Sequence, residues 1–124
     1  MVRVPAAEDL IVADVKIALT GAAGLVGQNL IPRLKSRGYH SIVALDKHKA
    51  NTAILRRLHP DITVIETNLA QEDGWQSAVA DADVLILSHA QIGGLEEAAF
   101  KANNITATER VVFAMKEGKI VKKP

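Results

Sequence analysis

A glycine-rich stretch, Thr20 to Leu30, constrains the fold of this chain more than any other part of it. It follows an apolar run, Val15 to Leu19, which has the pattern of a buried strand. It leads into a segment whose apolar residues recur at helical spacing, at Val26, Leu30 and Leu34. The pattern Gly-x-x-Gly-x-x-Gly therefore lies between a predicted strand and a predicted helix. In this arrangement the pattern indicates a ligand-binding turn.

Each glycine of this pattern has its own physical reason. Gly21 allows a sharp turn off the strand, and Gly24 removes the side chain where a pyrophosphate must approach the backbone. Gly27 allows the helix to lie close to the sheet. The free N–H groups around Leu25 and Val26 then face an anion, with the positive end of the helix dipole behind them. Because the Gly-Lys-Ser/Thr ending of a Walker phosphate loop is absent, the pattern predicts a dinucleotide site.

Apolar strands and amphipathic helices alternate along the chain. Strands are predicted at residues 14–20, 40–46, 61–66 and 83–88, and helices at residues 24–37, 50–58, 71–80 and 95–117. Gly38 and Gly118 are expected to end the first and last of these helices. Right-handed crossovers then give a Rossmann-type, doubly wound parallel sheet in the order 3-2-1-4. Residues 1–13 are predicted to be an N-terminal arm, and residues 14–124 an incomplete dinucleotide-binding domain in which Ile120 and Val121 begin a further strand.

The composition excludes several other functions. The 124 residues include 15 Lys and Arg against 14 Asp and Glu, so the net charge of +1 gives no reason to expect nucleic acid or a membrane surface as partner. The uncharged stretch Ile17 to Pro32 is 16 residues long, shorter than the roughly 18 apolar residues of a membrane span. Cys is absent and the four His lack the spacing of metal ligands, so no metal site is predicted. We expect a cytoplasmic protein.

Three further features follow the glycine pattern in a specific order. They are Asp46 at the end of the second strand, the segment Asp83 to Gln91, which contains the fourth strand, and Asn104-Ile105-x-x-Thr108 in the long helix. Together they resemble the extended short-chain dehydrogenase/reductase family of NAD-dependent epimerases and dehydratases, over residues 14–121. The resemblance implies a sugar nucleotide or a similar hydroxyl-bearing molecule as substrate. One apolar face of the long helix, residues 95–117, is expected to cover the sheet. The other is expected to pack either in the homodimer that the resemblance implies or against further parts of the same chain.

Asp46 bears on the choice of cofactor. It lies 19 residues beyond Gly27, where an acidic side chain accepts hydrogen bonds from the ribose hydroxyls of adenosine. Since a carboxylate there repels a 2′-phosphate, NAD is favoured over NADP. This preference is weakened by Lys47, His48 and Lys49, which could pair with such a phosphate. The alternative is that Asp46 caps the next helix in a solvated loop.

Two segments depart from the family's pattern. Asn68-Leu69 stand where the family has Asp-Leu or Asp-Ile beside the adenine, and an Asn can still form a hydrogen bond with the edge of the base. Ser88, His89 and Ala90 replace Leu-Ala-Ala, and the resemblance implies that they line the nicotinamide-ribose side. His89 either contacts the cofactor or substrate or is a tolerated loop variant. The predicted cofactor-binding residues are Gly21, Gly24, Leu25, Val26, Gly27, Asp46, Lys47, Asn68, Leu69, Ser88, His89, Ala90 and Asn104.

The residues that carry the family's proton chemistry have no counterpart in these 124 residues. That chemistry requires a Tyr-x-x-x-Lys pair, in which the Lys lowers the pKa of the Tyr. The only tyrosine is Tyr39, and four residues on stands Val43, so no catalytic residue is predicted. We expect the cofactor-binding portion of a longer enzyme, inactive by itself, with the fourth strand as an exposed apolar edge. The alternative is a non-catalytic NAD(P)-binding sensor or scaffold, and a Tyr-x-x-x-Lys pair encoded after Pro124 would exclude it.

Overall fold

Four short strands form one parallel sheet in this computed structural model, which describes residues 14–89 and 96–120. They are β1 (Ile17–Thr20), β2 (Ile42–Asp46), β3 (Thr63–Glu66) and β4 (Val84–Leu87). Their order is β3-β2-β1-β4 and every pairing is parallel, which confirms the predicted topology. The predicted arm at residues 1–13, Ala90 of the predicted site and the segment from Val121 lie outside the described residues.

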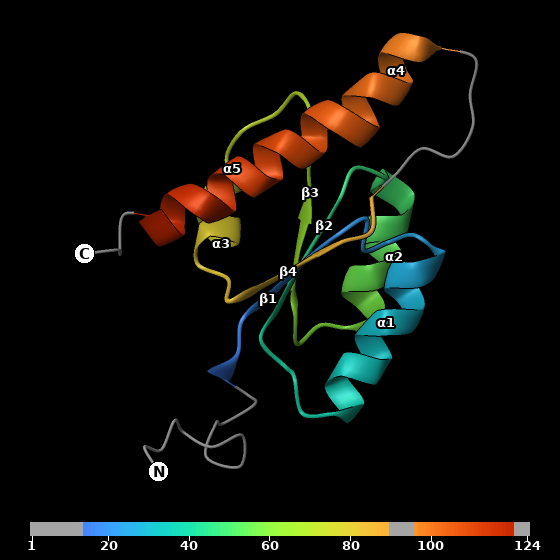
Figure 1. Cartoon of the computed structure of the whole chain (residues 1–124). Coiled ribbons are helices and arrows are strands. Elements are labelled where there is room, and N and C mark those ends of the chain that lie inside the picture. The colour runs from blue at the N-terminus through green and yellow to red at the C-terminus, as the bar shows by residue number, and fades with distance from the viewer. Residues whose placement is uncertain (1–13, 90–95, 121–124) are drawn as a thin grey trace.

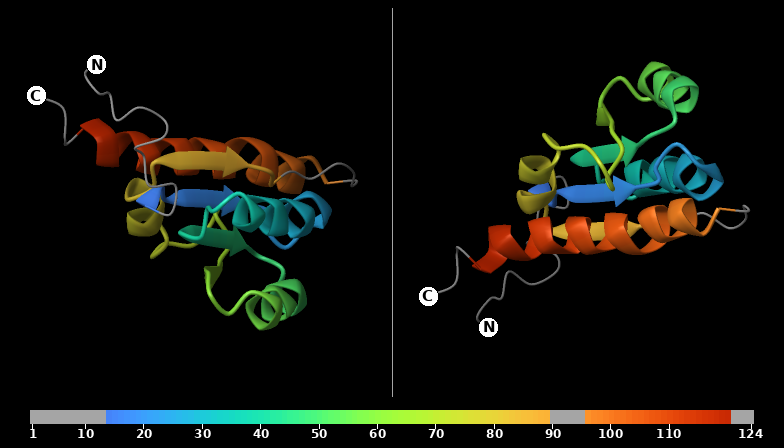
Figure 2. Two further views of the ribbon diagram at one scale, coloured as in Figure 1. Left: turned by 90° about the horizontal axis from the view of Figure 1, so that it is seen from below. Right: turned by 90° about the horizontal axis from the view of Figure 1, so that it is seen from above.

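Helices cover both faces of this sheet (Figure 1). Helices α1 (Leu25–Ser36) and α2 (Lys49–Leu58) lie on one face, and α3 (Gln76–Ala80) and α5 (Ala107–Ile120) lie on the other. Figure 2 shows α5 running alongside β1 and β4, with α4 (Glu97–Lys101) at the end toward which the strands point. The long C-terminal helical segment therefore reaches the carboxyl ends of the strands, where a ligand site is expected.

Alternate residues of the strands supply the two halves of the core. Ala18 and Leu45 pack with α3 and α5, and the largest side chain in this cluster is the fully buried Trp75. Leu19 and Ala44 point to the opposite face and pack with residues of α1 and α2. Since side chains alternate along a strand, this division follows from the apolar runs of the sequence.

The first helix ends as predicted, but the third is shorter than predicted. Helix α1 ends at Ser36, and Gly38 follows with a φ of 93°, the left-handed conformation that ends many helices. The helix predicted at residues 71–80 begins only at Gln76. Gly74 has a φ of 105°, and the indole N–H of Trp75 donates to the carbonyl oxygen of Glu72 at 2.8 Å. Residues 72–75 thus form an irregular loop with a bend at Gly74 in place of the first helical turn.

The helix predicted at residues 95–117 has three parts. A π-helical turn, η3 (Ala102–Thr106), separates α4 from α5, and α5 continues past Gly118 to Ile120. The predictions that Gly118 ends the helix and that Ile120 begins a strand are therefore wrong. A single glycine costs a helix about 1 kcal/mol relative to alanine, which weakens the helix without ending it. Among the described residues, no helix is long and apolar enough to cross a membrane.

Candidate functional site

A pocket of about 290 Å³ lies at the carboxyl ends of the strands. Each of the four strands contributes a residue at or just after its end, and η3 and α5 close one side. The pocket is lined by Gly21, Gly24, Asp46, Lys47, Thr67, Asn68, Leu69, Ser88, His89, Asn103 and Ala107. In a doubly wound sheet this is the end at which ligands bind, beside the point where the strand order reverses between β1 and β4.

The glycine turn is shaped by close backbone contacts. Gly21 has a φ of 64°, and a Cβ atom there would lie 2.6 Å from the backbone nitrogen of His89. A Cβ atom at Gly27 would lie 2.2 Å from the carbonyl oxygen of Ala22, so this glycine lets α1 approach the turn itself. At Gly24 a Cβ atom would meet only the carbonyl oxygen of Gly21, at 3.3 Å. The missing side chain of Gly24 is thus not explained by packing, and it leaves the pocket open to a ligand.

The N-terminus of α1 presents free donors beside this turn. Gly24 is the N-cap residue and offers no side-chain cap, and the first helical turn contains no acidic residue. The backbone N–H groups of Leu25, Val26 and Gly27 donate to no acceptor in the described part of the chain. Free N–H groups and the helix dipole together suit an anion such as a phosphate. The side chains of Leu25 and Val26 do not line the pocket and are 80% and 63% exposed.

The carboxylate of Asp46 is fixed at the end of β2 by two backbone donors. Its Oδ2 accepts from the N–H of Ala23 at 3.0 Å, and its Oδ1 accepts from the N–H of His48 at 2.9 Å. Helix α2 is capped instead by His48, whose Nδ1 accepts from the N–H of Asn51 at 3.2 Å. Asp46 therefore serves the glycine turn and the pocket, and it does not cap α2.

Lys47 spans part of the pocket and contacts η3. Its Nζ donates to Oδ1 of Asn103 at 2.7 Å, which holds an ammonium group at the pocket next to Asp46. The sequence indicated Asn104, whereas the residue that lines the pocket is Asn103. Sequence reasoning also missed Thr67 and Ala107. Thr67 directly precedes the predicted Asn68, but no sequence signal marks Asn103 or Ala107, because the π-helical turn changes which residues face the strands.

His89 joins three elements at the β4 side of the pocket. Its Nδ1 lies 2.6 Å from Oγ1 of Thr20, and its Nε2 lies 2.9 Å from Oγ1 of Thr108. The Thr20 hydroxyl already accepts from the N–H of Ser88, and the carbonyl oxygen of Ile86 is 3.5 Å away, so its proton is best donated to Nδ1. The neutral ring then carries its proton on Nε2 and donates it to Thr108. Burial lowers the pKa of His89, and the Asp46 carboxylate opposes only part of that effect.

We expect the free energy of unfolding to fall as the pH drops below about 6.5, the ordinary pKa of histidine. Burial lowers the pKa of His89 and, with help from Lys35, that of His59 in the folded state. The unfolded chain therefore binds more protons in this range, and stability rises with pH until both histidines are neutral in either state. Urea unfolding at pH 5.5 and 7.5 measures the difference, which should shrink in His89→Gln and His59→Gln. An undiminished difference in both variants would refute this assignment.

The fold is that of a Rossmann-type α/β domain, and comparison with protein families identifies the lineage. The model of the NAD dependent epimerase/dehydratase family matches residues 17–122. The chain belongs to this family, and the resemblance stated from the sequence is confirmed. The family is NAD-dependent, which agrees with the predicted cofactor. Within residues 14–89 and 96–120, no group of three or more His, Asp or Glu residues could hold a metal ion.

Solved structures share the fold at low sequence identity. An oxidoreductase of the short-chain dehydrogenase/reductase family from Burkholderia thailandensis is 24% identical, with a TM-score of 0.70 over 87% of this chain and 47% of its own. The enzyme WbmF from Bordetella bronchiseptica, in complex with NAD+ and UDP, is 23% identical, with a TM-score of 0.68 over 85% of this chain and 33% of its own. This chain thus spans less than half of either protein. A comparison with curated proteins gives no significant match.

Proposed function

We propose that this chain supplies the NAD site of an epimerase, dehydratase or dehydrogenase that acts on a sugar nucleotide or a similar hydroxyl-bearing substrate. The observation that carries the cofactor part is that Gly24 and Asp46, from two neighbouring strand ends, line one pocket. The substrate class is supported by the family and by the UDP bound to WbmF. The chain itself has no Tyr-x-x-x-Lys pair, so the acid and base of the reaction are not among its residues.

The proposed roles follow the order of the strands. The pyrophosphate would accept from the N–H groups of Leu25 and Val26, and the adenosine ribose would donate to Asp46 at the end of β2. The nicotinamide ribose would lie toward Ser88 and His89, beyond β4 on the other side of β1. When bound, NAD supplies the hydride chemistry, and these residues bind and orient it. The homodimer through the long helix also stays a proposal, supported by the exposed Phe113.

We expect Asp46→Asn to weaken NAD binding about tenfold or more, because the charged acceptor for the ribose is lost and the new NH2 group opposes one of the two backbone N–H groups that Asp46 holds. Discrimination against NADP should fall at the same time, because the repulsion of the 2′-phosphate is lost and Lys47 remains. Isothermal titration with NAD, NADP and ADP-ribose measures both effects. Asp81→Asn is the matched control, since Asp81 pairs with Lys16 at the opposite end of the sheet. The proposed function fails if the wild-type protein binds none of these ligands.

A further inference from the structure

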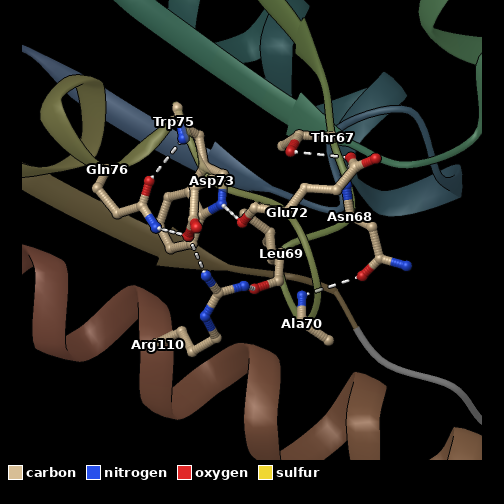
Figure 3. A network of polar contacts seen from close by, with 10 residues as sticks. Thr67, Asn68, Leu69, Ala70, Glu72, Asp73, Trp75, Gln76 and Arg110 are labelled. Atoms are coloured by element: carbon tan, nitrogen blue, oxygen red, sulfur yellow. Dashed lines mark hydrogen bonds and ion pairs between the residues drawn. The ribbon is translucent and has the colours of Figure 1, made fainter.

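Asn68, the second residue after β3, is held in one orientation at the pocket. Its backbone N–H donates to Oε1 of Glu72 at 2.7 Å, and its side-chain Oδ1 accepts from the N–H of Ala70 at 3.0 Å. Because a backbone N–H can only donate, the side-chain atom that faces Ala70 must be the amide oxygen. The Nδ2 group has no partner among the described residues and points away from the loop (Figure 3).

The loop that carries Asn68 is fixed from both sides. Glu72 also accepts from the hydroxyl of Thr67 at 3.3 Å, and its carbonyl oxygen accepts from the indole of Trp75 at 2.8 Å. From α5, Nη1 of Arg110 donates to the carbonyl oxygen of Leu69 at 2.5 Å, and its Nη2 pairs with the Asp73 carboxylate (Figure 3). The amide of Asn68 is therefore oriented before any ligand arrives.

The position of Asn68 in the sheet identifies what it would meet. In the order β1, β2, β3 the strand ends carry the glycine turn, Asp46 and Asn68. If the first two hold the pyrophosphate and the ribose, the base attached to that ribose extends toward β3 and Asn68. This step rests on the proposed function. Leu69, which is almost fully buried, supplies an apolar contact beside the polar group.

We propose that Asn68 selects the base of the dinucleotide by donating a hydrogen bond to an acceptor on its edge. The amino group at C6 of adenine is itself a donor and cannot accept from Nδ2, so adenine can accept from it only through its ring nitrogens. Hypoxanthine carries a carbonyl oxygen at C6 in place of the amino group and a hydrogen on N1, so its C6 oxygen is the acceptor that can take the hydrogen bond from Nδ2. The site thus takes nicotinamide hypoxanthine dinucleotide at least as well as NAD.

Asn68→Asp tests this proposal, because it replaces the donating Nδ2 group with an accepting oxygen and keeps the shape of the side chain. An aspartate still accepts from the N–H of Ala70, but its outward atom becomes an acceptor, which suits the amino group of adenine. Isothermal titration with both dinucleotides should give the wild type a Kd ratio near one or in favour of hypoxanthine. The variant should shift the ratio about tenfold toward NAD. Asn51→Asp adds the same charge on α2 and should leave the ratio unchanged.

The outcomes separate this inference from the proposed function. If neither dinucleotide binds to the wild type, the proposed function is wrong and this inference falls with it. If both bind, but the wild type prefers NAD tenfold or more and Asn68→Asp leaves that ratio unchanged, only the role of Asn68 is overturned. A thermal melt of each variant shows whether the loop and the fold survive the substitution.

Discussion

Gly27→Ala should lower the free energy of unfolding by about 3 kcal/mol, the upper range for an overpacked site, and unfold much of the protein. The added methyl carbon would lie 2.2 Å from the carbonyl oxygen and 2.5 Å from the carbonyl carbon of Ala22. Both are backbone atoms of a turn that is buried on the sheet, so neither can rotate aside as a flexible side chain would. Urea unfolding followed by far-UV circular dichroism measures the loss.

Gly24→Ala is the matched control for this substitution. Its methyl carbon would meet only the carbonyl oxygen of Gly21 at 3.3 Å, and the backbone of Gly24 has an ordinary extended conformation with φ −78° and ψ 180°. The stability should change by less than about 1 kcal/mol, whereas NAD affinity should fall because the methyl group occupies the approach of the pyrophosphate. Equal stabilities of the two variants would contradict the account of Gly27, and unchanged NAD affinity would contradict that of Gly24.

The sheet could be predicted from the sequence because each strand and helix is marked by residues that are neighbours along the chain. Apolar runs such as Ile42 to Leu45 alternate with helical patterns, and the handedness of the crossovers leaves few possible strand orders. The glycine turn and Asp46 could be found for the same reason, since each follows directly from a strand end. The late start of α3 at Gln76, the π-helical turn η3 and the helical state of Ile120 needed the structure.

The part of the pocket made by long-range contacts could not be predicted. Arg110 of α5 binds the carbonyl oxygen of Leu69 and the carboxylate of Asp73, which are about 40 residues away in the sequence. The spacing of these residues does not indicate that they are in contact. The π-helical turn before α5 likewise decides that Asn103 lines the pocket, although the sequence pointed to Asn104. Such contacts depend on the position of α5 on the sheet. The spacing of apolar residues in the sequence does not determine that position.

Trp75→Ala should cost about 3 to 5 kcal/mol of unfolding free energy, the range for truncating a large buried aromatic residue. Trp75 is fully buried between α5 and the sheet, and its indole N–H donates to the carbonyl oxygen of Glu72. The guanidinium of Arg110 also lies 5.6 Å from the centre of its ring. The substitution therefore leaves a cavity, frees the carbonyl oxygen of Glu72 and removes a contact of the arginine that fixes the pocket loop. Circular dichroism must follow unfolding, because the chain has a single tryptophan.

Trp75→Phe separates the packing of the ring from the hydrogen bond of the indole. Phenylalanine keeps most of the buried apolar surface but has no N–H, so its cost should stay near 1 to 2 kcal/mol, about that of one unmade hydrogen bond and a small void. Because Glu72 also binds the backbone N–H of Asn68, loosening Glu72 should weaken dinucleotide binding more than the stability loss suggests. Unchanged affinity in a folded Trp75→Phe variant would show that the buried core and the pocket loop are energetically independent.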